Sequence, residues 1–184
     1  MLEQKNLNDI KNLGISAAAY FDVFDSEFKF DIRFRELCEN NTCGSYGRNY
    51  MCPPSVGSFE DCMREVLRYD QALITETIHP LEDSFDYEGM MEGGGIHDEN
   101  VNKVWEYIKN NMNYKELKIL GAGGCRLCPK CGITDDVPCR FPDLAISSVE
   151  AHGIDVAHLT ETHGLKYING ENTVTYVALY LLKY

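Results

Sequence analysis

The feature that most constrains this chain is a run of four cysteines, Cys125-x2-Cys128-x2-Cys131-x7-Cys139. Its two overlapping C-x-x-C steps place three thiols on one tight loop, which points to a shared metal or redox role. The N-terminus shows no signal-peptide pattern, and the most apolar run, 174–182, is too short to cross a membrane. We therefore expect a cytoplasmic protein, in which clustered thiols indicate metal or redox chemistry rather than disulfides.

The spacing of these four cysteines favours an iron–sulfur cluster of the 4Fe-4S type. Three thiols at this pitch suit the corners of a cubane, as in the run C-x2-C-x2-C-x3-C-P of bacterial ferredoxins. Here the fourth cysteine is further away, and the proline follows the second cysteine as Cys128-Pro129. Cys139 is therefore either the fourth ligand of the same cluster or a ligand of another one. A zinc knuckle made from the same four cysteines is the alternative.

Glycines and basic residues surround this run. Gly123 and Gly124 allow the backbone to approach a cofactor closely, and Arg126 and Arg140 place positive charge beside the thiolates. We expect these four residues to belong to the cofactor site, where the arginines raise the reduction potential or hold an anionic partner. Ordinary solvated surface charges are the alternative interpretation of the arginines. A dinucleotide loop is excluded, because G-x-G-x-x-G requires glycine where Arg126 stands.

A second set of cysteines, Cys38-x4-Cys43-x8-Cys52, lies upstream in a polar segment rich in glycine and proline. Such residues predict a rigid wrapping loop over 38–57 that presents thiols inward. These three cysteines indicate either a second metal site or a part of a shared one, with buried inert thiols as the alternative. Cys62 falls near the apolar face of an expected helix, so we expect it to be a core residue.

Hydrophobic periodicity predicts a single domain over 1–184, of the α+β or α/β class, with a central mixed sheet of four to six strands, helices packed on it and cysteine-rich metal-binding loops. Strands are expected over 15–24, 71–78 and 117–120, and a terminal hairpin over 167–168 and 173–182. Helices are expected over 2–13, 59–69, 101–112, 142–152 and 155–162. The acidic, glycine-containing segment 82–100 is expected to be a mobile loop, with a lid over a site as the lesser alternative.

Charge and the lack of catalytic motifs narrow the function classes. Acidic residues outnumber basic ones by 29 to 17, which gives a formal net charge of −12. Nucleic acid and anionic lipid require a basic face, so both are excluded as main partners. A protein redox partner, reached through the basic residues beside Cys125, is the better expectation. No Ser-His-Asp arrangement, paired-carboxylate motif or phosphate loop is evident, so no catalytic residue is assigned.

Several motifs occur in a fixed order along the chain. They are Cys43-x2-Tyr46-Gly47-x4-Cys52-Pro53-Pro54, Gly124-Cys125-Arg126-Leu127-Cys128-Pro129-x-Cys131, Pro138-Cys139-Arg140-x-Pro142 and Ser148-x-Glu150-Ala151-x-Gly153-Ile154-Asp155-Val156. In these motifs the chain resembles a predicted metal-binding family called domain of unknown function 2284, from about residue 15 to the C-terminus.

The resemblance implies metal binding but no particular reaction. The family's cysteine positions match Cys38, Cys43, Cys52, Cys125, Cys128, Cys131 and Cys139. Cys62 falls outside the motifs. His152 stands where the family often has Cys or Tyr, and an imidazole ligand there would raise the potential of a cluster. His158 and His163 are weaker candidates, since a lone histidine is more often a surface or core residue.

We therefore expect an iron–sulfur protein with one or two 4Fe-4S clusters, in electron transfer or redox activation of a partner. Two other functions are open: a zinc-stabilised binding module without a redox role, and a cluster-dependent enzyme with an open iron site.

Overall fold

The computed structural model describes residues 4–24 and 28–184 and has a five-stranded mixed sheet at its centre. The strands are β1 (Ala17–Asp22), β2 (Gln71–Pro80), β3 (Glu116–Gly121), β4 (Ser147–Ser148) and β5 (Thr173–Lys183). They are ordered β1-β2-β5-β3-β4, and every neighbouring pair is antiparallel except β3 and β4. The helices are α1 (Gln4–Lys11), α2 (Ile32–Glu39), α3 (Phe59–Val66), α4 (Tyr87–Asn111) and α5 (Val156–Thr162), with short 3-10 turns η1 (Gly132–Asp135) and η2 (Glu150–His152). The α+β class and the mixed sheet are confirmed.

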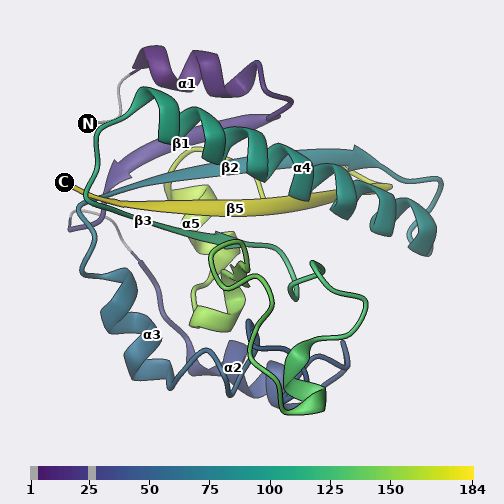
Figure 1. Ribbon diagram of the computed structural model, residues 1–184. Coiled ribbons are helices and arrows are strands. Elements are labelled where there is room, and N and C mark those ends of the chain that lie inside the picture. The colour runs from purple at the N-terminus through teal and green to yellow at the C-terminus, as the bar shows by residue number, and fades with distance from the viewer. Residues whose placement is uncertain (1–3, 25–27) are drawn as a thin grey trace.

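Helices cover both faces of the sheet (Figure 1). On the face of α1 and α4, Leu73 and Tyr180 pack in one core with Val104. On the opposite face, Ile74 packs in a second core with Leu159 of α5. Successive residues of β2 serve opposite cores because side chains alternate along a strand. Neither core, as far as the described residues define it, contains a cysteine, so burial of apolar surface alone accounts for the sheet and its helices.

Most of the expected elements are present. The structure confirms β1 within 15–24, β2, β3, α3 and α5, and it confirms the described part of the helix expected over 2–13, whose first residues lie outside the described range. Ser58 caps α3, because its Oγ accepts the backbone N–H of Asp61 at 3.1 Å. No helix in the described ranges is both long enough and apolar enough to span a membrane.

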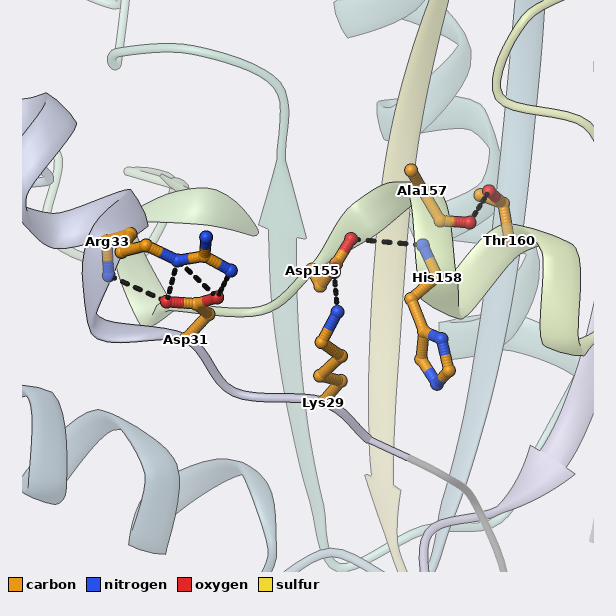
Figure 2. Close-up of polar contacts among 7 residues, drawn as sticks. All are labelled: Lys29, Asp31, Arg33, Asp155, Ala157, His158 and Thr160. Atoms are coloured by element: carbon orange, nitrogen blue, oxygen red, sulfur yellow. Dashed lines mark hydrogen bonds and ion pairs between the residues drawn. The ribbon is translucent and has the colours of Figure 1, made fainter.

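Two aspartates cap the helices that flank the cysteine region (Figure 2). Asp31 caps α2, and Asp155 caps α5 by accepting the backbone N–H of His158 at 3.0 Å. The Asp155 carboxylate also accepts from Lys29 Nζ at 2.8 Å. The backbone N–H of Asp31 donates to the carbonyl of Gly153 at 2.8 Å, and that of Asp155 to the carbonyl of Lys29 at 2.9 Å. These bonds fix α2, which carries the first cysteine, to the segment before α5.

The expected mobile loop over 82–100 is wrong, and so is the lid that it suggested. Residues 87–111 form one long helix, α4, even though three consecutive glycines lie within it. A Cβ on Gly93 would lie 2.9 Å from Cγ of His79, and one on Gly94 would lie 3.6 Å from the Tyr176 ring. The missing side chains let the helix approach the sheet closely, and that packing outweighs the low helix propensity of glycine.

The glycine triplet gives a matched pair of substitutions. Gly93→Ala is expected to lower the free energy of unfolding by about 1–2 kcal/mol, because the new methyl group overlaps the base of the His79 side chain. Gly95→Ala meets nothing within 4 Å and is expected to raise it by about 0.5–1 kcal/mol through helix propensity. Urea unfolding of both variants checks this prediction, and equal signs would contradict it.

Strand pairing overturns two further expectations. The helix expected over 142–152 is a turn followed by β4, which pairs with β3, and by η2. The terminal hairpin is absent because β5 lies between β2 and β3, so both of its edges are already paired. The loop expected from residue 38 begins later, since Cys38 lies in the last turn of α2. In the first two cases long-range strand pairing overrides the local pattern.

Candidate metal centre

The four cysteines of the 125–139 run line one cavity of about 170 Å³. It is lined by residues of the loop after β3 and of the turns after α2. These two segments lie below the sheet in Figure 1. All four thiols are half-buried and none is in a disulfide. The volume is about ten times what one water molecule needs, so it accommodates a group of several atoms. The other lining residues are Gly44, Ser45, Arg48, Asn49, Tyr50, Met51, Leu127, Pro129, Gly132, Arg140, Phe141 and Ala145.

Two side chains from the segment that carries Cys43 and Cys52 hold the 125–139 loop in place. Nδ2 of the buried Asn49 donates to the carbonyl of Cys125 at 2.9 Å, while its Oδ1 accepts the backbone N–H of Met51 at 2.9 Å. The hydroxyl of Tyr50 donates to the carbonyl of Val137 at 2.9 Å. Neither residue can be identified from the sequence, because nothing in their spacing distinguishes them from other loop residues.

Removal of the Asn49 amide is expected to loosen the cavity. Asn49→Ala breaks the bonds to Cys125 and Met51, so we expect the free energy of unfolding to fall by about 1–2 kcal/mol. We also expect faster loss of bound metal to a chelator, followed by absorbance. Asn111→Ala removes an exposed amide that bonds only within α4, and it should change neither quantity. Equal metal release from the two variants would contradict the prediction.

The two cysteine sets meet at Gly124. A Cβ at this position would lie 3.2 Å from Oγ of Ser45 and 3.5 Å from Sγ of Cys52. The Cys52 thiol therefore lies directly against the backbone that leads into Cys125. Glycine at 124 makes this approach possible, as the sequence predicts, although the close neighbour here is the other cysteine segment.

The pKa of the Cys52 thiol depends on cysteines of both sets. Burial, and after it the neighbouring thiols of Cys43, Cys38, Cys125 and Cys131, together raise the pKa of the Cys52 thiol to about 11. Cys52 is therefore within electrostatic reach of both sets. Without a positive charge beside it this thiol is protonated at neutral pH, so a bound metal must displace its proton.

Burial and two backbone N–H groups act in opposite directions on the pKa of the Cys125 thiol. Burial raises the pKa of the Cys125 thiol, while the backbone N–H groups of Leu127 and Ile146 bond to the sulfur and lower it. N–H groups that point at sulfur stabilise a thiolate and, in a cluster, raise the reduction potential. The turn segment before β4, which replaces the expected helix, supplies one of these two donors, the N–H of Ile146.

The described thiols do not converge as the ligands of one metal ion do. Four thiolates on one zinc ion at about 2.3 Å lie about 3.8 Å from one another. Within the described part of the chain, no three His, Cys, Asp or Glu side chains are placed to hold one metal ion. In a cubane each cysteine binds a different iron, so the thiols lie around a cavity of the kind observed.

The expected cofactor-binding residues separate into two places. Arg140 lines the four-cysteine cavity and donates to the carbonyl of Lys130 at 3.0 Å. Gly123, Gly124 and Arg126 line a neighbouring cavity instead, which shares Cys125 with the first. The guanidinium of Arg126 bonds to Asp98 of α4.

Cys62 and His152 lie away from the cavity. Cys62 is 1% exposed and donates to the carbonyl of Val56 at 3.5 Å, which confirms it as a buried packing residue, although it belongs to neither core of the sheet. His152 is also 1% exposed, and burial lowers the pKa of its imidazole to about 4. Its Nδ1 lies 3.1 Å from the carbonyl of Ser148. The buried guanidinium of Arg35, which the sequence analysis missed, lies 3.6 Å from the Cys62 sulfur.

Residues 23–182 match the family model described as predicted metal-binding protein (DUF2284). The chain belongs to this family. The expected family resemblance is thereby confirmed, and it extends over both cysteine sets.

Other comparisons add little. No curated protein matches the chain significantly. Two solved structures of epoxyqueuosine reductase are 8% identical to it: the Bacillus subtilis enzyme with its catalytic loop swung out, and a complex with a modified tRNA stem loop. Their TM-scores are 0.45 and 0.41, and they cover 98% and 96% of this chain. The chain spans 44% of the length of each, and similarity at this level supports no functional argument.

Proposed function

We propose that this protein binds one or two 4Fe-4S clusters and transfers single electrons to or from a protein partner. The observation that carries the proposal is the cavity lined by Cys125, Cys128, Cys131 and Cys139. A bound cluster supplies reversible one-electron chemistry. Cys38, Cys43 and Cys52 either complete this centre or hold a second cluster beside it. The contact of Cys52 with Gly124 supports placing the two sets at one centre.

The protein's own groups would tune such a centre in three ways. The backbone N–H groups of Leu127 and Ile146 bond to the Cys125 sulfur and favour the more negative, reduced state. Arg48 and Arg140 line the cavity and favour that state through their positive charge. The half-buried thiols limit the access of water. The N–H groups and the arginines stabilise negative charge at the centre, whereas the exclusion of water opposes it.

The same cavity supports a protein as the redox partner. The apolar side chains of Leu127 and Phe141 line it and are 44% and 43% exposed. Arg48 and Arg140 lie beside them on a chain whose net charge is −12. An apolar centre with a basic rim suits a partner with an acidic contact surface. We expect the rate of electron transfer to such a partner to fall as ionic strength rises.

Anaerobic purification tests the proposal directly. We expect a brown protein with equal amounts of iron and acid-labile sulfide and, after reduction, a paramagnetic signal from a cluster. Four or eight iron atoms per chain correspond to one or two clusters of this type. A protein that contains zinc and no sulfide would instead be the structural zinc module, and the proposal would be abandoned.

Variants of the two cysteine sets distinguish one shared centre from two. If the centre is shared, Cys52→Ser and Cys131→Ser should each remove nearly all of the iron. If there are two clusters, each variant should lose about half of the iron, and the paramagnetic signals that remain should differ. Iron content and spectra of the two variants from parallel anaerobic preparations decide between these arrangements.

A further inference from the structure

A second cavity, of about 130 Å³, shares a wall with the four-cysteine cavity. Cys125 and Leu127 line both. The apolar side chains of Val101 from α4, and of Leu144 and Ile146 from the segment before β4, line the second cavity. A cavity of about 150 Å³ in another protein accommodates benzene, so this one has room for a short aliphatic group.

One pair of opposite charges lies in the lining of this cavity. Nε and Nη2 of Arg126 donate to Oδ2 of Asp98 at 3.0 and 2.7 Å, so both bonds end on the same carboxylate oxygen. Within the described ranges, Oδ1 of Asp98 and Nη1 of Arg126 have no hydrogen-bond partner. The two side chains are 45% and 40% exposed, which leaves both atoms accessible to a ligand. A Cβ on Gly123 would lie 3.4 Å from Nη1, which places the guanidinium against the glycine loop.

We infer that this cavity binds an aliphatic α-amino acid or another small zwitterion of that class. Its carboxylate meets Nη1 of Arg126, its ammonium group meets Oδ1 of Asp98, and its side chain packs against the apolar walls. A simple anion would face the Asp98 carboxylate, and a simple amine would face the guanidinium, so each meets a like charge that a zwitterion does not. The bound compound would lie beside Cys125. That it would also lie beside a metal centre depends on the proposed function.

Calorimetric titration of the full chain with three matched probes tests this inference. We expect leucine to bind at one saturable site. We expect 4-methylpentanoate, which lacks the amino group, and 3-methylbutylamine, which lacks the carboxylate, to bind at least about tenfold more weakly. Both comparison probes keep the apolar group, so the difference reports on the two charges.

Variants locate the site. Arg126→Met and Asp98→Asn should each weaken leucine binding about tenfold or more. Leu144→Trp, at a half-exposed position, should fill the cavity and abolish binding while the ion pair stays intact. Arg64→Met removes an arginine from an exposed ion pair on α3 and should leave the affinity unchanged.

The inference is overturned if 4-methylpentanoate binds as tightly as leucine, if Arg126→Met binds leucine normally, or if leucine does not saturate the protein in the roughly millimolar range. Iron and sulfide are measured on the same samples. Leucine binding by an iron-free protein would support this inference and contradict the proposed function. Iron and sulfide without leucine binding would do the reverse.

Discussion

Cys128→Ala is expected to lose at least half of the iron and sulfide of the anaerobically purified protein while its sheet stays folded. Cys128 is one of the four thiols that line the 125–139 cavity, so its removal leaves one corner of a cluster without a ligand. The two hydrophobic cores contain no cysteine among their described residues, so they do not depend on a bound metal. Iron, sulfide and visible absorption measure the first effect. The thermal midpoint, which should equal that of metal-free wild-type protein, measures the second.

The matched control for this variant is Cys62→Ala. Cys62 is a buried thiol outside the cavity, so its replacement should keep the iron content and cost about 1 kcal/mol of stability through lost packing. Full iron content in Cys128→Ala would contradict the assignment of the centre. Loss of iron from Cys62→Ala would contradict the assignment of Cys62 as a packing residue and of Cys128 as a metal ligand.

Gly153→Ala is expected to lower the free energy of unfolding by about 2–5 kcal/mol. Gly153 has a φ of +74°, in the left-handed region that costs other residues about 1–2 kcal/mol. A Cβ at this position would also lie 2.3 Å from Cε2 of Phe59, at the start of α3. Overlap with the ring adds about 1–3 kcal/mol. Urea unfolding followed by circular dichroism measures the total.

Gly164 separates the two causes of this loss. It has nearly the same φ, +76°, but a Cβ there would meet nothing within 4 Å. Gly164→Ala should therefore cost only the backbone term of about 1–2 kcal/mol. In a Phe59→Leu background, Gly153→Ala should approach the same small cost, because the overlapping ring atoms are gone. If the two alanine variants lose equal stability, close packing against Phe59 is not the reason for glycine at 153.

Local sequence patterns predicted the elements that depend on near neighbours. Ser58 followed by an apolar stripe predicts α3, and the alternating residues before Pro80 predict β2, because caps and periodicity act within a few residues. The same reasoning failed for the glycine triplet of α4. Its local propensity indicates a loop, but the contacts of Gly93 and Gly94 with the sheet favour a helix. Such contacts join residues far apart in the chain and leave no periodic signal.

The cysteine positions, their spacing and the family follow from the sequence by itself, because a C-x-x-C step constrains its thiols wherever the loop lies in the fold. Only the tertiary structure showed that Cys52 lies against Gly124, that Asn49 holds the carbonyl of Cys125, and that Arg126 pairs with Asp98 beside a second cavity. The physical reason is distance along the chain. Asn49 and Cys125 are 76 residues apart, and the pairing of β3 with β4 and β5, together with the packing of α4, decides which loops meet.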